Sequence, residues 1–287
     1  MRLCTQGRLI YNLRMLLGIY FRRTIAIPQD HGSWVFLFSP LLIGLFAGED
    51  FSQGTWALIT AAITVFLIRQ PITTAAKVKS GRRPRSDMPA AIFWICLYGL
   101  VLSFSLTYLI YLEYFFLLTL AIPGITVFAW HLYLVSKRND RGQAGVEILA
   151  TGALALSAPA AYWVSSGIFS PDGWWLWILT WLQSAASIIY AYLRLEQRSL
   201  QDLPSRQKRI TLGKRALRYS SFNLVLTVVL SIANILPTLI FLPYLLQWLE
   251  TIWGIFHPAI GYRPTRIGFR QLAISSIFTI IFILVWR

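Results

Sequence analysis

Residues Pro28-Gln29-Asp30-His31-Gly32-Ser33-Trp34 run directly into Val35–Gly48, a stretch that carries no charge. An acid, an imidazole and a glycine therefore stand where an apolar helix begins. Polar groups at such a depth are costly unless they are paired or used. This change from a polar cluster to an apolar run predicts that a membrane-spanning helix starts here. The rest of the chain likewise alternates polar segments with apolar runs.

The composition of the whole chain is that of a membrane protein. Of its 287 residues, 56% are hydrophobic and only 13% are charged, whereas a soluble domain has about 25% charged residues. In a soluble protein the net charge of +15 would suggest nucleic acid as a partner. Here the cations lie between apolar runs, as in cytoplasmic loops, so we expect no nucleic-acid partner. The two cysteines lie far apart and predict neither a disulfide nor a metal site.

Nine apolar runs predict an all-α fold, a polytopic transmembrane helical bundle with about nine spans. The first two runs are short for a bilayer, whose hydrocarbon core is about 30 Å thick. The boundary at Pro237 is the least secure, because residues 219–254 could also form one kinked helix. The runs lie at 34–48, 54–70, 90–111, 114–134, 145–164, 173–193, 219–236, 237–254 and 268–286.

The distribution of cations orients this bundle. With nine spans and a cytoplasmic N-terminus, 25 of the 26 Lys and Arg residues fall on the cytoplasmic side, and only Arg287 lies outside. Merging the seventh and eighth spans would put the basic segment 263–270 on the wrong side. The positive-inside rule therefore favours nine spans, with the C-terminus outside, in a bacterial inner membrane or an internal membrane.

The chain is expected to have two parts. Residues 1–27 carry five arginines around an apolar stretch too short to span, which predicts an interfacial amphipathic segment on the cytoplasmic surface. Residues 28–287 contain no separate soluble domain and predict a single transmembrane bundle. Within it, Gly44 and Gly48 form a pair of small residues that would let two helices approach closely.

Two groups of polar residues in the first part of the chain are candidates for ligand binding. Asp30 and His31 could bind an anion or move protons, or Asp30 could simply cap the first span. No further His or Cys lies at ligand spacing, so a metal site is not favoured. Arg69 and Lys77 share a helix face if the helix continues past Pro71, and could hold a phosphate-bearing headgroup or extend to lipid phosphates.

Two more groups follow in the middle of the chain. Tyr133 and Lys137 are four residues apart and share a helix face where the fourth span ends. Glu147 enters the fifth span in its first turn, where the helix dipole favours an anion, although an ion pair with a basic neighbour would also explain it. The sixth span has one polar face, which must line a cavity or a helix interface. That face consists of Gln183, Ser187, Tyr190 and Arg194.

Under the predicted topology these four groups lie at the same level of the membrane. Together they predict a cytoplasm-facing pocket that is rich in cations. An anionic amphiphile is the ligand that such a pocket would take, and membrane lipids are the expected neighbours of the whole bundle.

The opening stretch 28–34, with Pro40 and Gly44 after it, resembles the Pro-Lys-Glu-His-Gly-Ala-Trp start of the bacterial YwiC-like membrane proteins. The resemblance extends over most of the chain, from about residue 27 onward. It implies an integral membrane protein and attaches no activity to it.

More distantly, the chain is similar to the UbiA superfamily of intramembrane prenyltransferases, which have nine spans and polar cytoplasmic loops after spans two and six. Tyr133-x3-Lys137 matches their Tyr-x3-Lys element, and Ser187-Ile188-Ile189-Tyr190-Ala191 resembles their Asp-x-x-Tyr-Ala stretch. Arg83-Pro84 matches an Arg-Pro after their first acidic motif, and Gly213 falls near their later glycine. This resemblance implies a UbiA-like bundle and an isoprenoid ligand.

The chain departs from the UbiA enzymes where they hold Mg²⁺, in two Asp-rich motifs. Residues 69–77 contain no acid, and Ser187 stands where the second motif has Asp. Because Mg²⁺ requires hard oxygen ligands, the sequence supports no magnesium cofactor, and it assigns no catalytic residue. Cations could bind phosphate directly instead, either in an altered transferase or in a non-catalytic relative.

Two other functions stay open. An accessory or assembly subunit would bind a membrane protein partner, which suits the many aromatic residues and the glycine pair. A transporter is less favoured, because the halves of the chain show no repeat and we find no acid or lysine within a span on a transport path.

Overall fold

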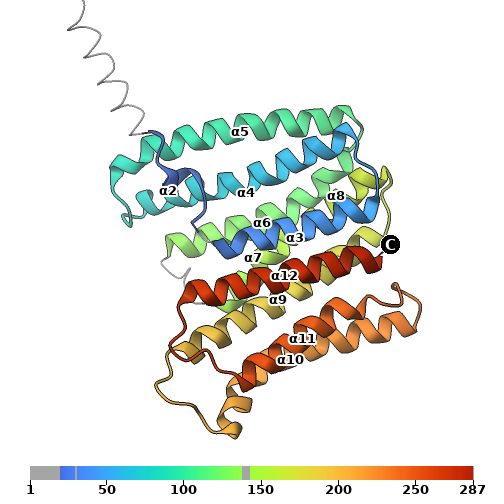
Figure 1. Ribbon diagram of the computed structural model, residues 1–287. Helices are drawn as coiled ribbons and strands as arrows, with labels where there is room; N and C mark the ends of the chain where they lie inside the picture. The colour runs from blue at the N-terminus through green and yellow to red at the C-terminus, as the bar shows by residue number, and fades with distance from the viewer. Residues whose placement is uncertain (1–19, 30, 138–142, 287) are drawn as a thin grey trace, which may run out of the picture. The chain divides into compact units, whose positions relative to one another are not determined.

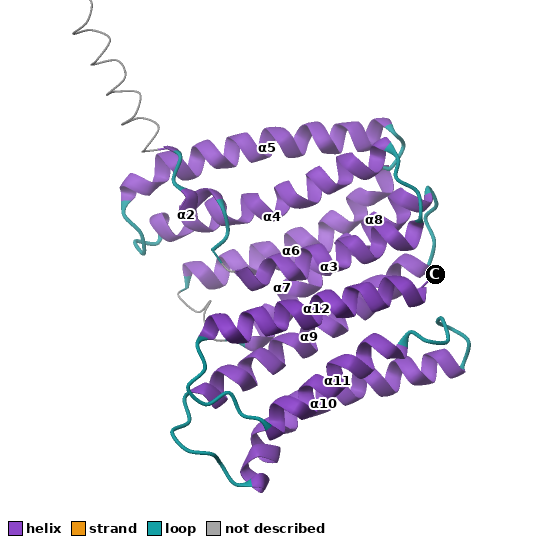
Figure 2. Cartoon of the chain, viewed as in Figure 1, coloured by secondary structure: helices purple, strands orange, loops and turns teal. Residues whose placement is uncertain are grey.

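The computed structural model of the chain describes residues 20–29, 31–137 and 143–286, without the side chain of His31. Within these ranges every element of regular structure is a helix (Figures 1 and 2). The all-α helical bundle that the sequence predicts is thus confirmed. Most of the predicted interfacial segment 1–27 lies outside the described residues, which include only its last part with the short helix α2 (Arg23–Ala26).

A helix lies at each of the nine predicted spans. The fifth span is divided at Leu156 into two consecutive helices, and two short 3-10 helices, η1 (Arg85–Asp87) and η2 (Phe115–Leu117), lead into α5 and α6. The helices are α3 (His31–Gly48), α4 (Gln53–Lys79), α5 (Met88–Tyr111), α6 (Leu118–Ser136), α7 (Ala144–Ala155), α8 (Ser157–Ser166), α9 (Asp172–Arg198), α10 (Arg206–Ile232), α11 (Phe241–Phe256) and α12 (Pro264–Trp286).

Six helical segments in the described ranges are long and apolar enough to cross a membrane, and Gly32–Gly48 is a shorter apolar helix. The protein is therefore a multi-pass membrane protein. The helices at the predicted seventh and eighth spans are not among the six: α11 has 16 residues, and α10 begins with several basic residues. Which membrane holds the protein, and which end faces the cytoplasm, stay predictions.

The uncertain boundary near Pro237 is a turn between two helices. The chain leaves α10 at Ile232 and reverses through Asn234, whose φ of 55° is left-handed. The hydroxyl of Ser231 donates to the carbonyl of Pro237 across this turn (3.2 Å). Residues 219–254 are therefore two helices, as favoured from the charge distribution, and the kinked single helix is excluded.

The chain forms two compact units. Unit 1 comprises residues 1–30, 56–115 and 128–141, and unit 2 comprises 31–55, 116–127 and 142–287. In unit 1, Asp87 accepts hydrogen bonds from Arg22 (2.6 Å) and Arg83 (3.3 Å). Ile25 of α2 packs beside Ala90 of α5. Arg22 and α2 are thus held against the start of α5 by both charge and packing.

In unit 2, two glycines of α3 allow close packing against α8. A Cβ at Gly44 would overlap the backbone of Ala158, and a Cβ at Gly48 would overlap the side chain of Ser165. The hydroxyl of Ser165 lies 3.5 Å from the carbonyl oxygen of Gly44. The glycine pair of the first span is therefore a helix-packing surface, as its spacing predicts.

One end of unit 2 collects the cations, and we call it the basic end. It is formed by the end of α9, the start of α10, the end of α11 and the start of α12 (Figures 1 and 2). Two hydrogen bonds tie these parts together: Gly261 N donates to Arg198 O (3.3 Å), and Arg209 Nη1 donates to Phe256 O (2.8 Å). The basic end carries Arg198, Arg206, Lys208, Arg209, Arg263 and Arg266.

Replacing Gly44 by Ala should destabilise unit 2, because the added methyl group has no room against the backbone of Ala158. Overpacking of this kind typically costs about 1–3 kcal/mol. We expect a lower thermal unfolding midpoint in detergent for Gly44→Ala. Gly99→Ala is the matched control, since nothing lies within 4 Å of a Cβ at Gly99 of α5. Equal midpoints for the two variants would contradict the close α3–α8 contact.

Candidate functional site

The polar face of α9 lines a cavity at the basic end of unit 2. The cavity has a volume of about 240 Å³ and lies between α9, the end of α11, the following loop and the start of α12. Its walls combine guanidinium groups with aromatic rings. The lining residues are Tyr190, Arg194, Trp253, Tyr262, Arg266, Ile267, Arg270 and Gln271.

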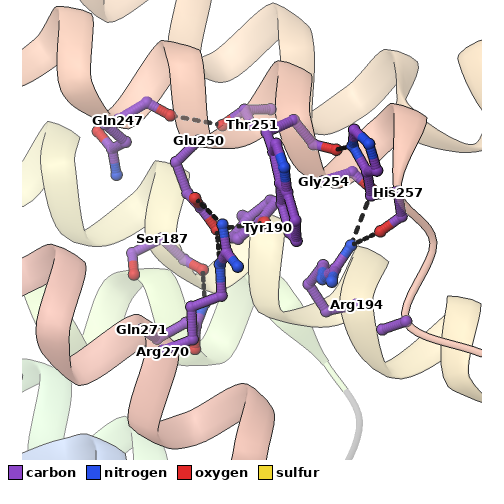
Figure 3. Close-up of polar contacts among 12 residues, drawn as sticks. Ser187, Tyr190, Arg194, Gln247, Glu250, Thr251, Gly254, His257, Arg270 and Gln271 are labelled. Carbon is purple, nitrogen blue, oxygen red and sulfur yellow. Dashed lines mark hydrogen bonds and ion pairs between the residues drawn. The ribbon is translucent and has the colours of Figure 1, made fainter. Parts of the chain in front are cut away.

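A buried carboxylate joins the three helices around this cavity. Glu250 of α11 accepts hydrogen bonds from Arg270 Nε (2.6 Å) and Arg270 Nη2 (2.7 Å). Tyr190 Oη of α9 donates to the same carboxylate (2.7 Å). The side chain of Glu250 is 8% exposed and that of Arg270 is 40% exposed, so the ion pair extends from the core to the cavity (Figure 3).

Aromatic rings hold the arginines of the cavity in place. The guanidinium of Arg270 lies 3.5 Å from the ring centroid of Trp253, and that of Arg194 lies 5.5 Å from it. Arg266 lies 4.3 Å from the ring centroid of Tyr262. Such cation–π contacts orient a guanidinium without neutralising it. The positive charge of the three arginines therefore persists at the cavity wall.

Arg194 is also the cap of α11. It is 2% exposed, and its Nη1 donates to the carbonyls of Gly254 (2.8 Å) and His257 (2.7 Å). These carbonyls lie where α11 ends and its dipole favours a cation. Gln197 Nε2 donates to Gly254 O as well (3.0 Å). Arg194 therefore contributes its charge to the cavity while its hydrogen bonds hold the backbone.

The residues around the cavity have a net positive charge. The lining residues Arg194, Arg266 and Arg270 carry three positive charges, and Glu250 supplies one negative charge. The net charge of these four groups is therefore +2. In the described ranges no three His, Cys, Asp or Glu side chains gather closely enough to hold a metal ion. The absence of a magnesium cofactor stays a prediction from the sequence.

The predicted polar face of α9 is brought together as the spacing indicates. Tyr190 and Arg194 line the cavity, and the carbonyl of Ser187 accepts from Gln271 Nε2 of α12 (3.1 Å). Glu147 is not part of this group. It is exposed on α7 and accepts from Tyr192 Oη (2.7 Å), on α9.

The other predicted site residues belong to unit 1 or lie outside the described residues. In unit 1, α4 continues past Pro71, the guanidinium of Arg69 lies 5.1 Å from the ring of Phe66, and Lys77 is partly buried. Lys137 Nζ lies 5.8 Å from the ring of Tyr133, as their spacing predicts. Asp30 is not among the described residues, and neither is the side chain of His31. The ligand role of all these residues stays a prediction.

Sequence reasoning overlooked the central ion pair. Glu250 is the single acid in the apolar helix Phe241–Phe256, and an acid within a span is by default a candidate functional residue. Glu250 was not among the candidate residues predicted from the sequence, and the expectation that no span holds an acid on a transport path stays a prediction. Arg270 was counted only as a loop cation, whereas it lies in α12 and reaches Glu250 across the α11–α12 hairpin.

Arg270→Met should destabilise the protein, because it leaves the buried carboxylate of Glu250 without its charged partner. An unsatisfied buried acceptor typically costs about 1–3 kcal/mol. The double variant Glu250→Met/Arg270→Met should regain part of this loss, since it removes both charges. A double-mutant cycle of unfolding free energies measures the coupling, and additive effects would show that the ion pair stabilises nothing.

The comparisons with known proteins agree with the opening motif. Residues 27–162, just under half of the chain, match the family described as YwiC-like protein. A relative from Bacillus subtilis (strain 168), named Uncharacterized protein YwiC, is 27% identical over 172 residues. That match covers 57% of this chain and 62% of the relative, so the chain spans less than two thirds of the relative's length. No solved structure matches.

The family match begins just before α3 and ends within α8, so the cavity residues of α9, α11 and α12 follow it in the chain. Similarity to the UbiA enzymes stays a prediction. Residues 27–162 are thus similar to the YwiC-like family, as the opening motif predicts, and the chain as a whole is a membrane protein with multiple apolar helices.

Proposed function

We propose that the cavity of unit 2 binds the anionic headgroup of an isoprenoid or another anionic lipid on the cytoplasmic side of the membrane. The observation that carries this proposal is the set of three arginines around one cavity, of which Glu250 neutralises only one. The protein would act either as an altered UbiA-like transferase or as a non-catalytic relative.

The chemistry of the arginines suits a phosphate. Guanidinium groups bind phosphate oxygens through paired hydrogen bonds, and these are stronger than hydrogen bonds between neutral groups. Arg266 is exposed and stacks on Tyr262, so its N–H groups can turn toward a ligand. Arg270 uses the N–H of Nε and one N–H of Nη2 for Glu250, so two donors on Nη1 and one on Nη2 remain. A phosphate would therefore contact Arg266 first and then share Arg270 with Glu250.

A groove beside the cavity offers two aromatic rings to the apolar tail of an amphiphile, and Gly261, Arg263, Thr265 and Arg266 complete its lining. It is open, has a volume of about 480 Å³ and shares Tyr262 and Arg266 with the cavity. Phe269, which is 72% exposed, lies at this groove. A headgroup at Arg266 could thus be followed by a chain along Phe269. This combination favours a lipid over a small soluble anion.

Arg266→Ala should reduce the amount of a specific anionic lipid that copurifies with the protein by about tenfold, because a charge-assisted hydrogen bond to phosphate is worth about 1.5–3 kcal/mol. The measurement is quantitative mass spectrometry of lipids extracted from the purified protein. Arg218→Ala is the matched control, since Arg218 is an exposed cation of α10 that does not line the cavity.

The outcome separates the candidate functions. If both variants carry the same bulk lipids as the wild type, the cavity does not select a lipid. The protein is then better explained as an accessory or assembly subunit, or as a transporter. Capture of a membrane protein partner would support the first of these functions, and solute uptake in proteoliposomes would support the second. The double variant Arg69→Ala/Lys137→Ala, measured in the same way, tests the predicted role of the two cations in unit 1.

A further inference from the structure

A second, smaller chamber lies next to the arginine cavity in unit 2. It has a volume of about 20 Å³ and shares two lining residues, Tyr190 and Gln271, with the cavity. A volume of this size holds one water molecule or one hydroxyl group. Its walls are rich in amide and hydroxyl groups, and they consist of Gln183, Ser187, Tyr190, Gln247, Glu250, Thr251, Gln271, Ile274, Ser275 and Phe278.

One acceptor in this chamber is unsatisfied. Gln247 of α11 is 7% exposed, and its Nε2 donates to the carbonyl of Gln183 (3.0 Å). That bond fixes which end of the amide is the oxygen, because only the nitrogen can donate. Oε1 of Gln247 is buried, and no group of the described residues donates to it. Figure 3 shows Gln247 on α11 together with Glu250 and Thr251.

Three of the neighbouring donors have other partners. Gln271 Nε2 donates to Ser187 O (3.1 Å), and Thr251 Oγ1 donates to the carbonyl of its own helix at Gln247 (2.8 Å). The hydroxyl of Tyr190 donates to Glu250. A buried acceptor without a donor is costly, so Oε1 of Gln247 is placed to accept a hydrogen bond from a group that enters the chamber.

We propose that the chamber is a subsite for a hydroxyl group of the lipid headgroup, and that Gln247 Oε1 accepts its hydrogen bond. This inference rests on the proposed function, since the anionic group of the same lipid would lie in the adjoining cavity. An ammonium group would be a poor occupant, because the cavity already has two uncompensated positive charges. The preferred ligand is therefore a phosphodiester lipid whose headgroup carries an uncharged hydroxyl.

Two lipids with the same charge test this inference. Phosphatidylglycerol has hydroxyl groups beyond the phosphate, and phosphatidylethanol has none. With identical acyl chains, both are titrated into the full-length protein in phosphatidylcholine nanodiscs, and binding is measured by native mass spectrometry. We expect the wild type to prefer phosphatidylglycerol by about tenfold, because an analogue without the hydroxyl leaves the buried acceptor unpaired.

The variant Gln247→Met has nearly the same size and lacks the acceptor. It should bind phosphatidylethanol as well as the wild type does, which shows that it folds, and should lose the preference for phosphatidylglycerol. Gln207→Met, on the exposed start of α10, is the matched control and should keep the preference.

Four outcomes would overturn the inference. Equal affinity of the wild type for the two lipids would mean that the chamber holds only a water molecule. A preference that survives in Gln247→Met, or that disappears in Gln207→Met, would place the selecting group elsewhere. If neither anionic lipid binds more tightly than phosphatidylcholine, the proposed function itself fails, so the two failures are distinguishable.

Discussion

The buried carboxylate of Glu250 is the interaction on which the organisation of unit 2 depends. It lies within an apolar helix, where a lone charge would be very unfavourable, and it is compensated from two other helices by Arg270 and Tyr190. Three helices are therefore held in one register by a single charged group. The register places Trp253 beneath Arg270 and so forms the wall of the cavity.

The end of α11 depends on a second arginine in a related way. Arg194 satisfies the last carbonyls of the helix, and Gln197 accepts from Ala259 N in the chain that follows (3.3 Å). The loop that leads to α12 is thus fixed to α9, and Arg266 at the start of α12 is carried to the cavity. In this way one end of the unit uses its cations for two purposes: Arg194 completes the backbone hydrogen bonding, and Arg266 leaves its charge available to a ligand.

Much of the helix arrangement could be predicted from the sequence, because apolar runs and the placement of cations report directly on a bilayer. The separation of α10 from α11 followed from charge alone, and the polar spacing of Ser187, Tyr190 and Arg194 correctly indicated a cavity or an interface. The ion pair of Glu250 and Arg270 could not be derived, since it depends on how the α11–α12 hairpin aligns. Glu147 was assigned to the same site from its place in the sequence, and this was not reliable either. Its hydrogen-bond partner is Tyr192 of α9, and neither residue lines the cavity.

The shortness of α11 has a consequence for the surrounding lipid. A helix of 16 residues is about 24 Å long, which is less than the roughly 30 Å of a bilayer's hydrocarbon core. Where α11 crosses the bilayer, as the sequence predicts, the adjoining lipids would have to compress, because uncovered apolar chains and buried polar ends are both unfavourable. Compression would draw the phosphate layer toward the end of α11, whose residue Trp253 lines the cavity. The hydrophobic mismatch of one helix would thereby shorten the path that a headgroup travels from the bilayer to the arginines.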